Sequence, residues 1–454
     1  MSMPAVETTE RPTRRPFLAA HKDFASGADT PRAFLERCLA ALDRWEPKID
    51  AFVNLNIAGA REAANRSTER WREGKPLSPI DGMPVGIKDI IETIDMPTEQ
   101  GSPLFAGFRG ERDAATVQAL REAGAVILGK TVTTEFAATF PRETRNPWDV
   151  TRTPGGSSSG SAAAVAVGIV SAALGTQVIG SIIRPAGYCG CYGFKPTVGA
   201  VNRGGSYDGL SQSAHGTIAA SLEECWVVTW EIVQRAGGDA GHPGLYGPAK
   251  LPAAAKPRRL AFIETAGWST ASTGARNAMD DALARIKAAG VEVLTRRTHK
   301  KLDAIEADIL QANQVSRAIN AWEGRWPLNT YAARDAEKLS PPSRERLAQA
   351  EAMTLEDFRT LLATRNKSRA LHAELADEVD ACVSLTAPAA APVGLDWTGD
   401  PACTVHTSYL GIPSVTLPVM WDDGLPLGLQ VTGFAHGDAA TFAAAGWVET
   451  LFQK

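Results

Sequence analysis

The chain has 454 residues, of which 44% are hydrophobic and 22% are charged, and its formal net charge is −4. This composition excludes a disordered chain and provides for a large buried core. Charges of both signs are mixed along the sequence, so no basic stripe indicates nucleic acid, and the small acidic excess indicates no cationic partner. We therefore expect a small molecule as the ligand.

The sequence shows no targeting or membrane segment. Three arginines, Arg11, Arg14 and Arg15, precede an apolar run over 16–20 that is shorter than a signal-peptide core. No stretch reaches the roughly 18 apolar residues of a membrane span. The six cysteines are scattered, and Cys189 and Cys191 lack the further ligands of a zinc site. We expect buried free thiols, a cytoplasmic protein and no membrane contact.

The N-terminal half predicts helices first and a sheet afterwards. Apolar residues at helical spacing predict helices over 30–44 and 57–73. Short apolar runs bounded by Gly and Pro then alternate with helical patterns, which indicates an α/β fold with a mostly parallel sheet covered on both faces. The expected strands are 83–87, 125–129 and 170–174, and the expected helices between them are 116–123 and 159–167.

The C-terminal half continues with a loop rich in Gly, Ala and Pro over 237–256. A strand over 259–263, a helix over 274–290 and a strand over 291–294 are expected after it. Residues 300–380 predict several amphipathic helices without strands, which we expect to form a variable cap over one side of the sheet. Because no linker separates units, we expect a single domain over 1–454.

The most informative stretch is PGGSSSGSAAA at 154–164, where serines on a glycine-rich turn run into a helix of small residues. Glycine permits a tight turn, and the free N–H groups at a helix start stabilise negative charge. The segment Ala162–Val170 is almost wholly apolar, so it is not a linker. No lysine follows Gly160, which argues against a phosphate-binding loop.

The same stretch matches G-x-S-x-G, the nucleophile elbow of α/β-hydrolases, with Ser158 as the nucleophile. A buried strand should precede an elbow, but residues 148–154 are polar and end in a proline. No histidine lies in a recognisable motif; the candidates are His215, His242, His299, His372, His406 and His436. A Ser/His/Asp esterase centred on Ser158 stays an alternative.

A second glycine-serine turn and an isolated lysine complete the candidate chemistry. Ser181 closes the turn GTQVIGS directly after an expected strand, where open α/β sheets bind their ligands. Lys88 lies in the apolar run VGIKDII. Burial can lower a lysine pKa to ~5–6, which would make Lys88 a base near neutral pH, whereas pairing with Asp89 would leave it structural.

Together these elements resemble the amidase signature family, over roughly Lys48 to Gln430. The matching segments are VGIKDIIETIDMPTEQGS (85–102), GKTVTTEFA (129–137), RNPWDVTRTPGGSSSGSAAAVAVG (145–168), GTQVIGSIIRPAGYCGCYGFKPTVG (175–199), TGDP (398–401) and GLPLGLQV (424–431). The resemblance implies the α/β/α amidase signature fold, with its core at 80–235.

The resemblance also implies a Ser-cisSer-Lys triad, carried over to Ser181, Ser157 and Lys88. The interval of 24 residues between the two serines matches the family. Neutral Lys88 would take a proton from Ser157, held by a cis peptide bond, while Ser157 deprotonates Ser181, which attacks the carbonyl.

Further roles follow from the same resemblance. The backbone N–H groups of Val178, Ile179, Gly180 and Ser181 would form the oxyanion hole. Structural support is expected from the turn and helix around the serines, namely from Gly155, Gly156, Ser158, Ser159, Ser161 and Thr176.

The chain departs from the common family pattern at several positions. Gln177 replaces an Asp, Ile179 replaces a Gly, and the arginine has moved from position 183 to Arg184. This variant is similar to the malonamidase branch, in which such an arginine binds a substrate carboxylate; Arg184 has either that role or a structural one. The sequence also differs from the A-type chain of glutamyl-tRNA amidotransferase at Val132-Thr133 and over 211–216. A role in which the protein delivers ammonia within a complex is therefore the less favoured alternative.

The expected activity is hydrolysis of a small amide, anilide or carbamate (urethane), with ester cleavage as a further possibility of the same triad. We expect Thr133, Gln212 and His215 to contact substrate, alongside Arg184. The aromatic residues Trp322, Trp326 and Tyr331 either line the pocket or pack. The chemistry requires no metal and no organic cofactor, and a homodimer is left open.

Overall fold

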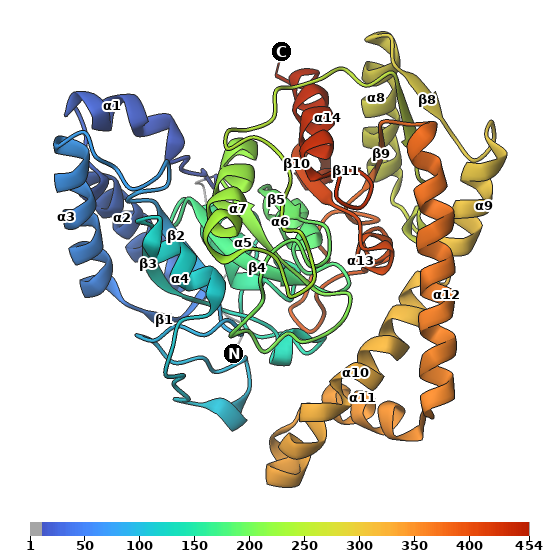
Figure 1. Cartoon of the computed structure of the whole chain (residues 1–454), viewed down its shortest axis with the longest axis horizontal. Coiled ribbons are helices and arrows are strands. Elements are labelled where there is room, and N and C mark those ends of the chain that lie inside the picture. The colour runs from blue at the N-terminus through green and yellow to red at the C-terminus, as the bar shows by residue number, and fades with distance from the viewer. Residues whose placement is uncertain (1–10, 454) are drawn as a thin grey trace.

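In the computed structural model, which describes residues 11–453, eleven strands form one mixed sheet in the order β1-β3-β2-β4-β6-β5-β10-β11-β9-β7-β8. The strands are β1 (Phe52–Leu55), β2 (Pro84–Lys88), β3 (Val126–Thr131), β4 (Ala172–Gln177), β5 (Tyr192–Lys195), β6 (Ala214–Ala219), β7 (Arg259–Phe262), β8 (Glu292–Leu294), β9 (Ala381–Leu385), β10 (Ser414–Asp422) and β11 (Leu425–Thr432). Every strand therefore belongs to a single continuous layer (Figure 1).

The helices flank this sheet and form an arm at one end. They are α1 (His21–Ser26), α2 (Pro31–Ile49), α3 (Ile57–Arg72), α4 (Ala115–Glu122), α5 (Ser159–Ala166), α6 (Ile183–Cys189), α7 (Leu222–Ala236), α8 (Thr273–Ala288), α9 (Lys300–Ile309), α10 (Ala312–Asp335), α11 (Pro341–Ala352), α12 (Leu355–Ala373), α13 (Val405–Leu410) and α14 (Asp438–Thr450). Short 3-10 helices cover Leu18–Ala20, Pro103–Phe105, Glu135–Ala137, Ala266–Trp268, Ala336–Lys338 and Glu374–Asp377.

The α/β prediction is confirmed, but the expectation of a mostly parallel sheet is wrong. Of the ten neighbouring pairs among the described strands, four are parallel and six are antiparallel. The hairpin β10–β11 illustrates the reason, because only Asp423 and Gly424, both with positive φ, connect its strands. A two-residue turn can join only antiparallel neighbours.

Polar caps explain where several predicted helices begin. The Thr30 hydroxyl accepts a hydrogen bond from Ala33 N at the start of α2, and Pro31 occupies the first turn. Asn56, Ser221 and Ser272 cap α3, α7 and α8 in the same way. The predicted helices over 30–44, 57–73, 116–123, 159–167 and 274–290 are confirmed, whereas the strand expected over 170–174 begins and ends later, as β4.

The core lies on both faces of the sheet because alternate strand residues point to opposite sides. In β4, Ala172 and Leu174 belong to a buried cluster that includes residues of α4, α7, α8 and α14, while Ala173 belongs to a second cluster with residues of α2, α3, α5 and α6. All eight residues of α5 are buried. The predicted burial of the apolar run after the serine-rich turn is therefore confirmed.

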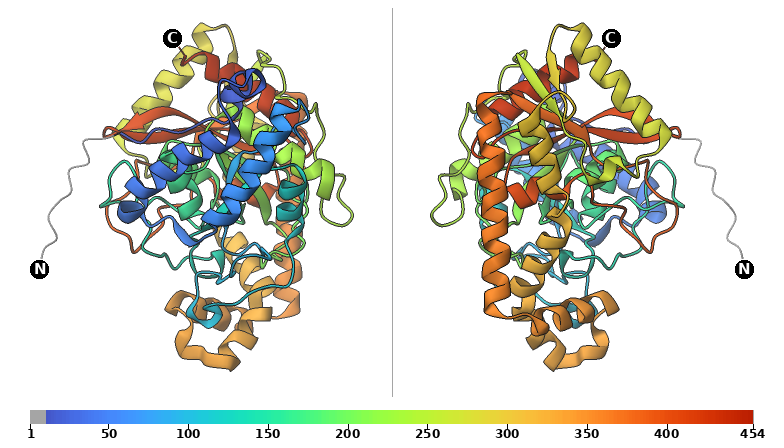
Figure 2. Two further views of the ribbon diagram at one scale, coloured as in Figure 1. Left: turned by 90° about the vertical axis from the view of Figure 1, so that its left-hand side faces the viewer. Right: turned by 90° about the vertical axis from the view of Figure 1, so that its right-hand side faces the viewer.

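The segment 300–380 is helical without strands, as predicted. Helices α10 and α11 pack against each other, and α12 packs against α10 and α13. Figure 1 places α8, α9 and α12 at the opposite end of the molecule from α1–α3, and Figure 2 shows the α10–α11 region projecting from the body. No helix among residues 11–453 has the length and apolar character to cross a membrane.

Candidate active site

The topology brings Lys88 to the end of β4. Strands β2 and β4 are parallel neighbours, with Ile87 opposite Leu174, so their carboxyl ends lie at the same edge of the sheet. The fully buried Lys88 Nζ lies 2.7 Å from Ser157 Oγ and 2.8 Å from Thr176 Oγ1 and donates to both. A more distant contact reaches Thr176 O at 3.4 Å.

Burial lowers the pKa of Lys88 to about 7, against a weaker opposing effect of the nearby Asp208 carboxylate. The low-dielectric surroundings disfavour the ammonium form, and no carboxylate pairs with Lys88 among the described residues. The alternative of a Lys88–Asp89 pair is wrong, because Asp89 pairs instead with Lys130 at 3.1 Å. Lys88 can therefore serve as a neutral base at physiological pH.

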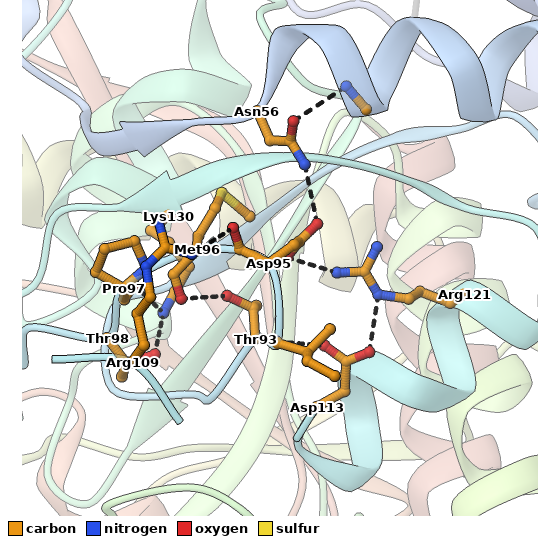
Figure 3. A network of polar contacts seen from close by, with 12 residues as sticks. Asn56, Thr93, Asp95, Met96, Pro97, Thr98, Arg109, Asp113, Arg121 and Lys130 are labelled. Carbon is orange, nitrogen blue, oxygen red and sulfur yellow. Dashed lines mark hydrogen bonds and ion pairs between the residues drawn. The ribbon is translucent and has the colours of Figure 1, made fainter. Parts of the chain in front are cut away.

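A polar network fixes the segment that follows β2 (Figure 3). Lys130 on β3 donates to Thr98 Oγ1 at 2.6 Å and to Pro97 O at 3.1 Å. Asp95 accepts from Asn56 Nδ2 at 3.0 Å and from Arg121 at 2.8 Å. These contacts anchor the chain immediately beyond the strand that carries Lys88.

Ser157 lies in the loop before α5, and the Gly156–Ser157 peptide bond is cis. Gly155 has a φ of 84°, a conformation that side chains rarely adopt. The Ser157 carbonyl accepts from Thr134 N at 3.3 Å. The turn thus holds the Ser157 hydroxyl toward Lys88.

Ser181 follows β4 on the loop 178–182 that leads into α6. Its carbonyl accepts from Ser158 N at 3.3 Å, and Ser181 lines the same pocket as Ser157. No hydrogen bond joins the two hydroxyls; such bonds are often loose before substrate binds. Among residues 11–453, no acceptor bonds the N–H groups of Val178, Ile179, Gly180 and Ser181.

Gln177, which stands where the family usually has Asp, organises this loop. Its Oε1 accepts from Ile182 N at 2.9 Å and from Ile183 N at 3.0 Å. Its Nε2 donates to Thr407 Oγ1 at 3.2 Å. The carboxamide oxygen therefore pairs with the free N–H groups at the start of α6, and the carboxamide NH2 group links α6 to α13. A carboxylate at this position has no N–H to donate to Thr407.

Arg184 lies one turn beyond Ser181 and is 5% exposed. Its Nε donates to Thr398 O at 2.8 Å, and its Nη2 donates to Gly156 O at 2.8 Å and Thr398 Oγ1 at 3.0 Å. Its Nη1 is buried without a partner among residues 11–453. One edge of the guanidinium is therefore structural, and the other edge is buried without a partner among residues 11–453.

Ser157, Ser181 and Arg184 meet in a pocket of about 280 Å³, whose lining among residues 11–453 does not include Lys88 or Gln177. Its lining includes Ser157, Thr176, Val178, Ile179, Gly180, Ser181, Arg184 and Asp208 from the body, with Arg317, Asn320, Glu345, Arg346 and Gln349 from α10 and α11 and with Phe136, Trp397 and Thr398. The cap residues and Trp397 escaped sequence reasoning. Phe136 and Thr398 had a signal, their places in the GKTVTTEFA and TGDP segments.

Three expected substrate contacts lie elsewhere. Thr133, Gln212 and His215 are not among the described residues that line the pocket. Gln212 is fully buried and donates to Val178 O at 3.2 Å. His215 lies on β6 opposite Thr176, where burial lowers its pKa to about 3. Thr133 Oγ1 donates to Thr134 O at 3.1 Å. Thr133 and Gln212 therefore bond neighbouring backbone, whereas both ring nitrogens of His215 are buried without a partner among residues 11–453.

The supporting serines are buried beside the pocket. Ser158 Oγ donates to Thr176 O at 3.4 Å, and Ser159 Oγ donates to Val132 O at 3.3 Å. Ser161 Oγ donates to Leu174 O at 3.0 Å. Ser158 is fully buried, does not line the pocket, and bonds no histidine among residues 11–453. The geometry does not favour an esterase centred on Ser158.

None of the aromatic residues Trp322, Trp326 and Tyr331 of α10 lines the pocket, and only Trp322 and Tyr331 pack against other rings. Trp322 stacks on Phe358 at 5.4 Å, and Tyr331 lies 5.0 Å from Phe105. Trp326 is 72% exposed at a kink in α10. All six cysteines are buried and free, as predicted.

Comparison with known proteins finds amidotransferase chains among the relatives and amidases among the solved structures. The A-type chain of the glutamyl-tRNA(Gln) amidotransferase of Chloroflexus aggregans is 33% identical over 476 residues, covering 94% of each chain. A solved amidase structure has a TM-score of 0.84 at 28% identity, covering 96% of this chain and 100% of the other. The native peptide amidase of Stenotrophomonas maltophilia has a TM-score of 0.74 at 26% identity, covering 99% and 97%. A family model described as Amidase matches residues 33–442, and the chain therefore belongs to the Amidase family.

Proposed function

We propose that this protein hydrolyses the C–N bond of small amides, including anilides and carbamates, through an acyl-enzyme on Ser181. The observation that carries the proposal is the contact of 2.7 Å between the buried Lys88 amine and Ser157 Oγ, in a pocket that Ser181 also lines. A lysine whose pKa is about 7 can accept a proton at neutral pH.

The mechanism moves one proton along the triad. Lys88 takes a proton from Ser157 while Ser157 takes the proton of Ser181, and Ser181 Oγ bonds to the substrate carbonyl carbon. When the tetrahedral intermediate collapses, the C–N bond breaks and the leaving nitrogen receives the proton through Ser157. Water then attacks the Ser181 ester by the same relay, which releases the acid and restores the free enzyme.

The loop 178–181 is the proposed oxyanion hole. Its N–H groups have no acceptor among residues 11–453 and lie at the pocket wall. Donors of this kind are worth ~3–4 kcal/mol where one has been removed in other enzymes. The Ile179 side chain lines the same wall, so it narrows the space beside the reacting carbonyl.

Carbamates and esters present the same electrophile. Attack on a carbamate that expels the amine breaks the C–N bond and leaves an alkoxycarbonyl-enzyme, whose hydrolysis releases the alcohol and carbon dioxide. Attack that expels the alcohol gives a carbamoyl-enzyme, whose hydrolysis releases carbamic acid, which breaks down to amine and carbon dioxide. We therefore include urethanase and esterase activity in the proposal. The buried free thiols agree with a cytoplasmic location, and the chemistry calls for no metal or organic cofactor.

The test measures amine release from aliphatic amides, anilides and aryl carbamates by the native protein, Ser181→Ala and Ser158→Ala. We expect Ser181→Ala to abolish turnover of every substrate that the native protein cleaves. Ser158→Ala should retain the nucleophile. Turnover that survives Ser181→Ala but not Ser158→Ala would overturn the proposal in favour of the elbow mechanism.

A second candidate follows from the amidotransferase A-type chains among the relatives, at 33% identity. In that role the protein would release ammonia from glutamine and deliver it to partner chains. Stable copurification with other chains and dependence of turnover on glutamine would favour this function. Rapid hydrolysis of other amides by the isolated chain would favour the free-standing enzyme.

A further inference from the structure

Three guanidinium groups line the pocket without a carboxylate partner. They belong to Arg184 on α6, Arg317 on α10 and Arg346 on α11. None of the three forms an ion pair among residues 11–453, although many other arginines of the chain do. The pocket therefore gathers three guanidinium groups that no carboxylate contacts directly, although Asp400 acts on the pKa of Arg184 and Glu135 on that of Arg346.

The two acidic residues of the pocket do not supply the missing partners. Asp208 accepts from the Ser213 hydroxyl and lies close enough to Lys88 to affect its pKa. Glu345 is exposed on the surface of α11. Glu135, the carboxylate that most affects the pKa of Arg346, is occupied by hydroxyl and backbone donors, including Ser343 Oγ at 2.6 Å.

Two buried polar side chains point to a ligand in this space. Arg184 and Asn320 are each 5% exposed, and Arg184 Nη1 and Asn320 Oδ1 have no hydrogen-bond partner among residues 11–453. Buried polar atoms are rarely left unpaired in native proteins. Both residues line the pocket, so their unpaired atoms lie next to the space that a substrate would occupy.

The cap presents its polar groups on adjoining helix faces. Arg317 and Asn320 are three residues apart on α10 and share one face. Arg346 and Gln349 repeat this spacing on α11, which packs against α10. Arg317 is also near enough to Arg184 to lower the pKa of that buried guanidinium, an effect that adds to the larger one of burial, since like charges repel. The charge therefore extends from the reacting centre toward the cap.

On the basis of the proposed hydrolysis, we propose that the substrate is an amide that bears a carboxylate. Arg317 and Arg346 of the cap bind this carboxylate. Asn320 hydrogen-bonds the part of the substrate between the carboxylate and the scissile amide. The planar guanidinium matches a carboxylate through paired hydrogen bonds. The pocket volume of about 280 Å³ limits the ligand to a small molecule. Arg317 and Arg346 are thus specificity-determining residues, distinct from the triad.

The kinetic test compares monoamides of succinate, glutarate and adipate with the corresponding neutral diamides, which have the same shape. We expect the native protein to favour the best monoamide by at least about tenfold in kcat/KM, after correction for the two amides of the diamide. Arg317→Met and Arg346→Met should each reduce that preference about tenfold, chiefly through the KM of the monoamide. Arg359→Met removes a charge from the exposed face of α12 and should leave both rates unchanged.

Calorimetric titration of glutarate and of glutaric diamide into the same variants provides a measurement independent of turnover. We expect the native protein and Arg359→Met to bind glutarate more tightly than the diamide, and Arg317→Met to lose that difference. Equal affinity for both ligands in the native protein would overturn the inference. If the native protein cleaves monoamide and diamide equally and Ser181→Ala cleaves neither, the inference of a carboxylate site is overturned but the proposed hydrolysis is supported. Tighter binding of glutarate than of the diamide, without turnover of any amide, would support the carboxylate site and overturn the proposed hydrolysis.

Discussion

Replacing Lys88 by methionine separates the catalytic role of the amine from its burial. The methionine side chain fills a similar volume without a charge, so the cavity stays occupied. The variant loses the contacts of 2.7 Å to Ser157 and 2.8 Å to Thr176. Because general-base assistance contributes roughly 10²–10⁴-fold, we expect kcat/KM to fall by at least about a hundredfold.

The same substitution has a stability consequence whose sign depends on pH. The pKa of Lys88 falls from 10.5 to about 7 on folding. Between these values the unfolded chain binds more protons than the native protein, so the stability of the native protein rises with pH. Below about pH 7 both states carry the proton, and folding bears the whole cost of burying the ammonium, roughly 5 kcal/mol.

Methionine at position 88 removes this linkage. Between about pH 6 and about pH 9 the free energy of unfolding of the native protein should gain about 3 kcal/mol relative to Lys88→Met, as measured by urea denaturation. Initial rates of the native protein should rise with pH through about 7, because only neutral Lys88 accepts the proton. A folded Lys88→Met protein with kcat/KM within about tenfold of native, or a pH–rate profile without that rise, would refute the reasoning.

The remaining predictions concern the oxyanion loop, the thiols and metal ions. Gln177→Leu leaves Ile182 N and Ile183 N unpaired; we expect about 2–4 kcal/mol lower stability in urea and a lower kcat. Iodoacetamide should not inactivate the native protein, because burial raises the pKa of Cys38, Cys191, Cys382 and Cys403 to about 12; loss of activity at native pH would contradict this. Dialysis against a chelator should leave hydrolysis unchanged, since the proposed proton relay uses only Lys88 and two serines; activity restored by added metal would contradict it.

Local sequence patterns predicted most individual elements in the N-terminal half. Helical spacing indicated α2, and short apolar runs indicated β2 and β3. Strand direction was beyond this kind of reasoning, because a strand has the same pattern in a parallel and an antiparallel pair. The antiparallel part of the sheet, from β4 to β9, therefore became visible only in the structure.

The sequence by itself determined which groups are available for the chemistry. These are glycines that permit the tight backbone conformation of the turn, two serines at a fixed interval, and an isolated lysine in an apolar strand. Tertiary structure alone decided that Lys88 contacts Ser157 rather than Asp89, because parallel pairing of β2 and β4 sets which side chains meet at the sheet edge. Tertiary structure also decided which cap residues line the pocket. Arg317 and Arg346 lie far from the triad in sequence, and only the packing of α10 and α11 over the loops turns two ordinary helix arginines into a candidate binding site.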